Sequence, residues 1–239
     1  MAVPRDADCD AAGRWRFGPR DDSIRADAQR HREGEVSQHA SPRRTLDPAA
    51  TRQRILSAAE ELYLERGVAA TTLSAVASRA EVSRPTVYKH FGDGDRLAAT
   101  VIDGELNTYF ERVADVLARH TRVREQLVEV LAFTVEYAAG HQLLQRQLEL
   151  DAAAVLTTFT TAAGPVLKRA IALLEPPLAA AIERGEIRPT ATDLVAEWVA
   201  RMALSLVLAP SVTRDLSQPA QLREHLTALV NGLLVPDGS

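Results

Sequence analysis

The stretch that decides the fold runs from Thr72 to Phe91 and reads TLSAVASRAEVSRPTVYKHF. Thr72 can cap one short helix and Ser83 a second, because Thr and Ser oxygens accept hydrogen bonds from the first free backbone N–H groups of a helix. Apolar residues at helical spacing give each segment one inward face: Leu73, Val76, Ala77 and Ala80 in the first, Val87 and Phe91 in the second. Two short helices separated only by Glu81 and Val82 have the spacing of a helix-turn-helix.

The residues before this stretch predict one longer helix. Asp47 followed by Pro48 marks its start, because Asp is a favoured N-cap and Pro fits the first helical position. Gly67 stands where a helix of about five turns would need a left-handed residue to end. The inward-facing positions are Ile55, Ala58, Ala59, Leu62 and Tyr63. A fourth helix is expected to begin after Asp93 and to run through Leu117.

Beyond residue 119 the apolar residues keep a helical period, and no alternating strand pattern occurs. Helices are expected at about Val123 to Ala139, His141 to Thr160, Pro165 to Glu183, Thr192 to Ala209 and Ser217 to Val235. Pro176 and Pro177 should kink or break the third of these, because each proline removes a backbone donor. The sequence therefore predicts an all-α fold, with a three-helix N-terminal helix-turn-helix unit and a larger helical domain.

The composition is that of an ordinary globular chain, with 239 residues, 46% hydrophobic and 25% charged, and a formal net charge of −4. Its single cysteine, Cys9, excludes an intrachain disulfide and favours a reducing compartment such as the cytoplasm. The mostly apolar run from Ala203 to Ala209 is far shorter than the roughly 20 residues that span a bilayer. The N-terminus lacks the apolar core of a signal peptide. We therefore expect a cytoplasmic protein with no membrane partner.

Residues 1–47 are predicted to form a disordered extension. Residues 1–48 hold nine arginines and nine acidic residues but very few large aliphatic side chains. Such a segment cannot bury enough apolar surface to offset its ordering entropy. Two interpretations stay open: Arg43 and Arg44 lie along DNA as an arm, or translation begins at Val36 and part of the segment is not made.

The second short helix exposes side chains suited to reading DNA. Arg84 can pair bidentately with guanine, and Thr86 can touch a thymine methyl or donate to a phosphate. Tyr88 and Lys89 can hold the phosphate backbone. The candidate DNA-contacting residues are Thr72, Arg84, Pro85, Thr86, Tyr88, Lys89 and His90. Each alone would be interpreted as part of a solvated helix face, but the spacing and caps of the whole segment favour DNA contact.

From Thr51 to about Leu106 the chain resembles the TetR-type (TetR/AcrR) transcriptional regulators. The resemblance lies in Arg54-Ile55-Leu56-x-Ala58-Ala59-x-x-Leu62-Tyr63, Gly67, Thr71-Thr72-Leu73, Val76-Ala77, Ala80-x-Val82-Ser83, Tyr88-x-His90-Phe91 and Leu97. It implies an all-helical homodimer whose DNA-binding domain, here residues 48–109 with the motif at 72–91, binds operator DNA. It also implies that residues 110–239 bind a small ligand and dimerise.

Two positions depart from the family pattern. Glu81 stands where the family usually has Gly in the turn, and a left-handed backbone there would suit Glu less well. Gly94 stands where the family often has Lys, so the phosphate contact of that lysine is not carried over. Arg96 is a candidate substitute for it.

The C-terminal helices carry candidates for a ligand pocket, namely Phe133, Tyr137, His141, Phe159, Trp198 and Met202. Core packing is the competing explanation for each, because aromatic residues at helical spacing are usually core. His141 has no second His or Cys at helical spacing, so neither a metal site nor a cofactor is expected. The many small side chains favour a mainly apolar effector.

The last two helices have broad apolar faces that suit a four-helix contact between two subunits. The candidate interface residues are Leu194, Trp198, Leu206, Leu222, Leu226, Leu229 and Leu233. Packing within the monomer is the competing explanation. A two-fold dimer would place its recognition helices about 34 to 36 Å apart on a palindromic site.

These observations predict a homodimeric repressor that a small molecule, of unknown identity, releases from double-stranded operator DNA. A regulator without a small-molecule ligand, or one controlled by a protein partner, is the alternative. A helical enzyme is not expected, because the sequence offers no paired carboxylates at a cleft, no nucleophile with a placed base and no glycine-rich phosphate loop.

Overall fold

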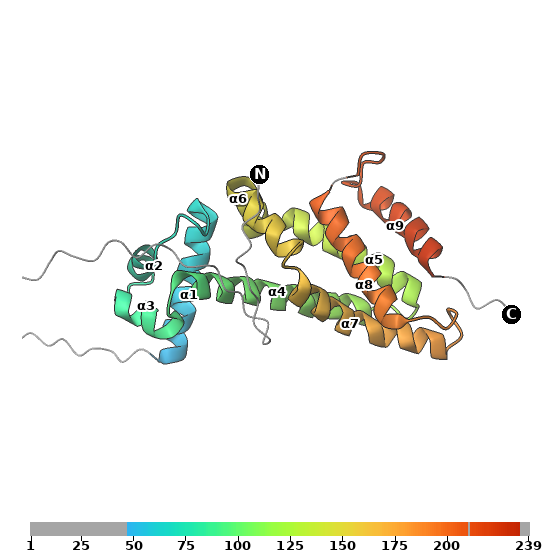
Figure 1. The fold of residues 1–239 in the computed structure, drawn as a ribbon, viewed down its shortest axis with the longest axis horizontal. Helices are drawn as coiled ribbons and strands as arrows, with labels where there is room; N and C mark the ends of the chain where they lie inside the picture. Colours follow the sequence, from blue (N-terminus) through green and yellow to red (C-terminus); the bar gives the residue numbers. More distant parts are fainter. Residues whose placement is uncertain (1–46, 210, 235–239) are drawn as a thin grey trace, which may run out of the picture.

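The computed structural model describes residues 47–209 and 211–234, which contain nine α-helices and no strand (Figure 1). The helices are α1 (Pro48–Arg66), α2 (Leu73–Arg79), α3 (Arg84–Phe91), α4 (Gly94–Ala118), α5 (Val123–Gly140), α6 (Gln142–Phe159), α7 (Gly164–Glu183), α8 (Thr192–Leu208) and α9 (Pro219–Leu233). The predicted all-α fold is confirmed. The predicted N-terminal extension, with Arg43 and Arg44, lies outside the described residues except for Asp47.

A head is formed by α1, α2, α3 and the start of α4, up to Val101. The predicted caps are present: the side-chain oxygens of Asp47, Thr72 and Ser83 accept hydrogen bonds from the first turns of α1, α2 and α3 at 3.1 to 3.2 Å. The predicted inward faces form one core in which Ile55, Leu62, Val76, Val87 and Leu97 are at most 1% exposed. The short helices are thus fixed by caps at their ends and by burial on one side.

The remaining helices form a body around a second, larger core. Its fully buried members include Leu127 and Leu131 of α5, Leu178 of α7, and Leu222 and Leu226 of α9. The long helix α4 belongs to both units, because Leu97, Ala98 and Val101 lie in the core of the head and Val113 and Leu117 in that of the body. Figure 1 shows α4 running from the head along the body.

Two helices depart from the expected pattern. Of the predicted kink or break at Pro176 and Pro177, the break does not occur, because α7 is one helix from Gly164 to Glu183, and the kink stays a prediction. Leu174, Leu178 and Ala181 of α7 are buried in the body, and this packing holds the helical path despite the missing backbone donors. The helix with an interruption is instead α6, where Asp151 has φ −150° and ψ 68°.

Taken singly, no helix in the described ranges is long and apolar enough to cross a membrane. The bent pair α6 and α7 meets the length and composition criteria only when the two helices are joined. The predicted end of the last helix at Val235 lies outside the described residues, and α9 ends at Leu233.

Candidate nucleic-acid interface

The helix α3 presents its polar side outward because Val87 and Phe91 anchor its other side in the core of the head. Of the seven candidate DNA-contacting residues, Arg84, Pro85, Tyr88, Lys89 and Thr72 are exposed, and Thr86 and His90 are half-buried. The aromatic side chain of Tyr88 is 67% exposed, which is unusual for a tyrosine without a partner surface. Six of the seven candidates therefore lie together on one short, well-anchored helix.

Two of these candidates have hydroxyl groups that already serve the fold. The oxygen of Thr72 accepts a hydrogen bond from the backbone N–H of Ala75 at 3.2 Å and so caps α2. The hydroxyl of Thr86 lies 2.8 Å from that of Ser83, the cap of α3. The structure thus gives both residues a structural role in addition to the DNA contact predicted for them.

Two arginines lie beside the turn that joins α3 to α4. The guanidinium of Arg52, on α1, lies 4.9 Å from the ring centroid of Phe91. Arg96, on α4, lies along Gly92 and has its Nε 3.9 Å from a carboxylate oxygen of Asp93. Arg52 lies outside the apolar stripe of its helix, and that pattern gives no sign that it reaches the end of α3. These two residues add positive charge beside the end of α3.

Glu81, which stands where the family usually has Gly, lies in the turn between α2 and α3. Glu81 has φ 53°, the left-handed region that favours Gly. Arg54 of α1 donates hydrogen bonds to the carbonyl oxygens of Ala80 and, at 3.4 Å, Glu81. Its guanidinium also lies 3.7 Å from the Glu81 carboxylate. Arg54 therefore ties down the turn that Glu81 strains.

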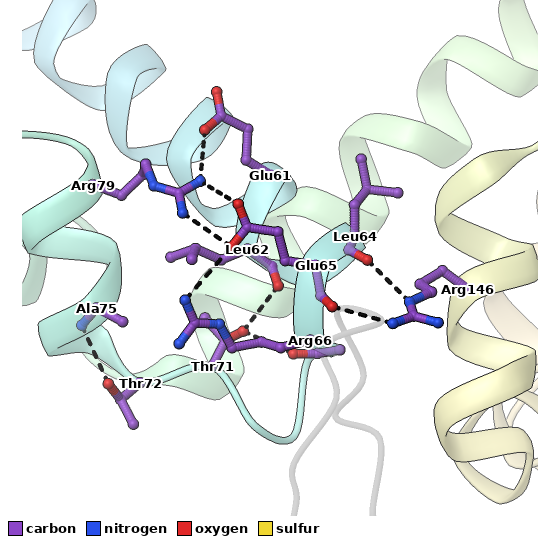
Figure 2. Close-up of polar contacts among 11 residues, drawn as sticks. Glu61, Leu62, Leu64, Glu65, Arg66, Thr71, Thr72, Ala75, Arg79 and Arg146 are labelled. Carbon is purple, nitrogen blue, oxygen red and sulfur yellow. Dashed lines mark hydrogen bonds and ion pairs between the residues drawn. The ribbon is translucent and has the colours of Figure 1, made fainter.

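A second set of ion pairs fixes α2 against α1 (Figure 2). The guanidinium of Arg79 lies 2.9 Å from a carboxylate oxygen of Glu61 and 2.8 Å from one of Glu65. The hydrogen bond from Arg79 lowers the pKa of the Glu65 carboxyl, and the two carboxylates raise the pKa of Arg79. These side chains are largely exposed, so the pairs orient the two helices more than they stabilise them.

Three of the predicted pocket residues come together in the body. Phe133 and Tyr137 of α5 are followed by His141, the residue after its end, with successive ring centroids 5.4 and 5.1 Å apart. Tyr109 of α4 joins them at 5.4 Å from Tyr137, and its hydroxyl lies 2.8 Å from that of Thr134. Burial raises the pKa of Tyr109 and of Tyr137. We call Tyr109, Phe133, Tyr137 and His141 the aromatic column.

The other three predicted pocket residues lie elsewhere. Phe159 is at the end of α6, Met202 packs against the core of the body, and Trp198 is 59% exposed on α8. His141 has both ring nitrogens engaged, with Nε2 2.8 Å from the Glu105 carboxylate and Nδ1 accepting from the Leu144 N–H at 3.2 Å. Within the described residues no group of three His, Cys, Asp or Glu side chains is placed to hold a metal ion.

The predicted interface residues divide into two groups. Leu194 and Trp198 lie one turn apart on α8 and are 55% and 59% exposed. Leu206, Leu229 and Leu233 are partly buried against the core of the body. Leu222 and Leu226 are 1% and 0% exposed, so packing within the monomer accounts for them and they are not available to a partner. The apolar stripe of a helix does not by itself reveal which neighbour covers it.

Two family models match the chain. The model of the bacterial regulatory proteins of the tetR family matches residues 55–101, from α1 into α4, and that of the bacterial tetracyclin repressor C-terminal domain matches residues 123–231, from α5 into α9. The chain belongs to the TetR family. The TetR-family helix-turn-helix therefore corresponds to α2 and α3, and the surface described above lies on the helix that follows its turn.

Known proteins that are similar to this chain agree with this assignment. An uncharacterized HTH-type transcriptional regulator of Mycobacterium tuberculosis, Rv2250c, is 29% identical over 192 residues, covering 79% of this chain and 96% of its own. A TetR-family regulator from Pectobacterium atrosepticum has the same fold, with a TM-score of 0.64 at 23% identity over 81% of this chain and 100% of its own. The TetR-family repressor AlkX from a Dietzia species, implicated in biodegradation of n-alkanes, has a TM-score of 0.54 at 27% identity over 76% and 94%.

Proposed function

We propose that this TetR-family regulator is a homodimeric repressor that reads a palindromic operator with α3 and is released by a mainly apolar small molecule. The observation that carries the proposal is the construction of α3, which is anchored by two buried side chains and exposes Arg84, Tyr88 and Lys89. Repression is supported by the description of AlkX as a repressor. A regulator of this kind acts where the chromosome is, so a cytoplasmic location belongs to the proposal.

The exposed residues of α3 divide between reading and holding DNA. Arg84 is at the first position of α3, where an arginine fork can reach guanine in the major groove. Lys89, in the last turn, is a point charge suited to a phosphate. Arg52 and Arg96 are assigned further phosphate contacts, Arg96 taking the role that Gly94 cannot. These contacts would make operator affinity fall steeply with salt.

In-vitro selection from random duplexes with the full-length chain tests DNA reading, followed by affinity measurements on the selected duplex and a scrambled one. Arg84→Ala should cost about 1 to 3 kcal/mol on the selected duplex and relax base choice at one position, whereas Lys89→Ala should weaken both duplexes by the same factor. Arg188→Ala, an exposed change in the loop before α8, is the control and should alter neither. Equal losses on both duplexes for Arg84→Ala would refute base reading, and a chain that selects no sequence would refute the proposed function.

Dimerisation is assigned to the exposed side of α8. Leu194 and Trp198 are large apolar side chains one turn apart, and such neighbours on a surface indicate a contact with another molecule. Trp198→Glu should shift the sedimentation of the chain from dimer to monomer and weaken binding to a full palindrome. Val212→Glu, at a single exposed apolar residue of the α8–α9 loop, is the matched control and should leave the dimer intact.

The effector is assigned to the aromatic column of the body, because its half-buried rings offer apolar surface next to a few polar groups. AlkX, implicated in n-alkane biodegradation, supports an apolar class of molecule. Titration of an operator complex with n-decane, and with decanoate as a charged match, tests this. If decane releases the protein from the operator and Phe133→Ala abolishes this release, the aromatic column is supported as the site. Release that persists in Phe133→Ala would exclude the column as the site.

One observation favours the alternative of a regulator without a small-molecule ligand or controlled by a protein partner. Open grooves run along α1 and α2 in the head, lined by Arg54, Arg79 and Glu81 among others. A partner protein that binds in these grooves would contact the head without a ligand in the body. Operator release by none of a broad panel of small apolar molecules would favour this alternative.

A further inference from the structure

The head and the body are joined at a second place besides α4. Leu143, Arg146, Gln147 and Leu150 lie at positions i, i+3, i+4 and i+7 of α6, so they share one face of its first turns. This face rests on the end of α1 and the residues that follow it. We call these four residues the α6 latch.

The polar part of the latch binds carbonyl groups at the end of α1. The last carbonyl oxygens of a helix have no partner within it, and those of α1 include Leu64 and Glu65, whereas the Tyr63 oxygen also accepts from the backbone N–H of Gly67 at 3.0 Å. Arg146 donates from Nε to the Leu64 oxygen at 3.1 Å and from Nη2 to that of Glu65 at 3.2 Å (Figure 2). Gln147 donates to the Tyr63 oxygen at 3.1 Å. The side-chain amide of Gln147 is used twice, because its oxygen also accepts from the backbone N–H of Val68 at 3.3 Å.

The apolar part of the latch enters the head itself. Leu143 is 8% exposed and belongs to the core that α1, α2, α3 and the start of α4 form. Leu150 packs on Gly67, where the Cβ of any other residue would stand 2.9 Å from its Cδ1. The glycine that ends α1 therefore also makes room for α6.

The latch ends where α6 is interrupted. Asp151 leaves the helical conformation, and its carboxylate accepts from the Ala154 N–H at 3.1 Å, which is the geometry of a new N-cap. Beyond it, within α6, Val155 is buried whereas Ala152, Ala153, Ala154 and Leu156 are exposed. The first turns of α6 are thus fastened to the head, and the interruption separates them from the rest of the helix.

We propose that Arg146 and Gln147 are positioning residues that set the direction in which each head presents α3, and thereby the half-site spacing that the dimer prefers. A head attached through α4 alone would follow any bend of that helix between Val101, in the core of the head, and Val113, in the core of the body. The latch holds α1 as well and restrains this motion of the head. Since a dimer reads two half-sites at a fixed separation, a rotated head reaches its second half-site at another spacing. This inference rests on the proposed function.

The first test compares the wild-type dimer with Arg146→Ala, Gln147→Ala and the double variant on the selected palindrome, with its central spacer shortened or lengthened by one or two base pairs. The wild type should prefer one spacing by about tenfold or more, and the double variant should reduce this ratio to about threefold or less. Affinity for a duplex with one half-site should stay within about twofold of the wild type, because α3 itself is unchanged. Arg146→Lys should restore part of the preference, since an ammonium can still donate to a carbonyl.

Gln142→Ala is the matched control, because Gln142 is exposed and starts the same turn of α6 outside the latch. It should keep the wild-type spacing preference. Each single variant removes only two of the four hydrogen bonds, so the comparison holds even where the double variant folds poorly. A spacing preference unchanged in all three latch variants would overturn the proposal, as would a loss on the single half-site as large as that on the palindrome.

A second measurement does not need DNA. Spin labels at Ser74→Cys in α2 and Thr121→Cys after α4, in a Cys9→Ser background and diluted with unlabelled protein, report the distance between head and body. The wild type and Gln142→Ala should give a narrow distribution, and the double variant a broader or displaced one. A distribution unchanged in the double variant would overturn the latch. Failure of the wild type to select any DNA would instead refute the proposed function, and the label distances would still decide the role of the latch.

Discussion

Replacing Gly67 by Ala tests whether the junction between α1 and α6 depends on a backbone that only glycine adopts easily. Gly67 has φ 85° and ψ 163°, a combination that is nearly confined to glycine. Its position is also crowded, because an added Cβ would stand 2.9 Å from Cδ1 of Leu150. Both features predict a loss of stability, and they differ in origin.

The magnitude follows from three contributions. Holding a residue other than glycine in this region costs roughly 1 to 3 kcal/mol. Moving the flexible end of Leu150 out of its rotamer adds roughly 0.5 to 1.5 kcal/mol. Alanine returns roughly 0.4 to 1 kcal/mol, because the unfolded chain with alanine has less freedom to lose. The net expectation is a free energy of unfolding that is lower by about 2 kcal/mol.

Urea unfolding followed by circular dichroism, at one fixed protein concentration, measures this change. With a slope of about 2 kcal/mol per molar urea, the midpoint should fall by about 1 M. Gly104→Ala is the control of opposite sign: Gly104 lies exposed within α4 with no atom within 4 Å of an added Cβ, so alanine should raise stability by about 0.5 to 1 kcal/mol. Leu150→Ala in the Gly67→Ala background removes the crowding and leaves the backbone cost. A midpoint for Gly67→Ala equal to that of the wild type would refute the reasoning.

Three further outcomes are expected. Glu81→Gly should raise the free energy of unfolding by about 0.5 to 1 kcal/mol. Relief of the left-handed conformation, worth about 1 to 2 kcal/mol, outweighs the extra freedom that glycine has in the unfolded chain. Thermal unfolding measures this change, and a loss of stability would contradict the assignment of strain. Burial, and next the charge of Asp95, raises the pKa of Tyr63 to about 12, so stability should be full below pH 10 and decline by about 2 to 3 kcal/mol as pH rises from 10 to 12. Tyr63→Phe should remove that decline in pH-dependent unfolding, whereas Tyr88→Phe, at an exposed ring, should not. Leu222→Ala should cost about 2 to 5 kcal/mol in urea unfolding, as expected for a fully buried side chain, and a cost below about 1 kcal/mol would instead return Leu222 to the subunit interface.

The sequence was most informative where local chemistry decides the structure. The caps Asp47, Thr72 and Ser83 and the end of α1 at Gly67 depend on residues a few positions apart, and all of them are found in the structure. Packing between distant segments was not predictable in the same way. Pro176 and Pro177 stay within one helix because the body holds α7, and α6 is interrupted at Asp151, where no proline or glycine marks a change.

The candidate site shows the same division. The polar side of α3 follows from its own sequence, because Val87 and Phe91 determine which side is buried. Arg52 and Arg146 could not be assigned, since each acts on a segment that is remote in the sequence. The apolar stripe of α9 likewise did not show whether Leu222 and Leu226 face a partner or the monomer. In each case the missing information is which surface lies opposite the residue.

The net charge of −4 is compatible with DNA binding because charge is segregated within the head. Residues 49–92 hold six basic and four acidic side chains, and the four acids are Glu60, Glu61, Glu65 and Glu81, all on α1 or in the turn before α3. Three of them pair with Arg54 or Arg79, so the charges of these two arginines are balanced by acids within the head. From Val82 to Gly92 the sequence has two basic residues and no acidic one. The positive charge of α3 is therefore not offset by an acid within its own segment, and each phosphate that this surface holds should steepen the fall of log affinity with log salt by about 0.9.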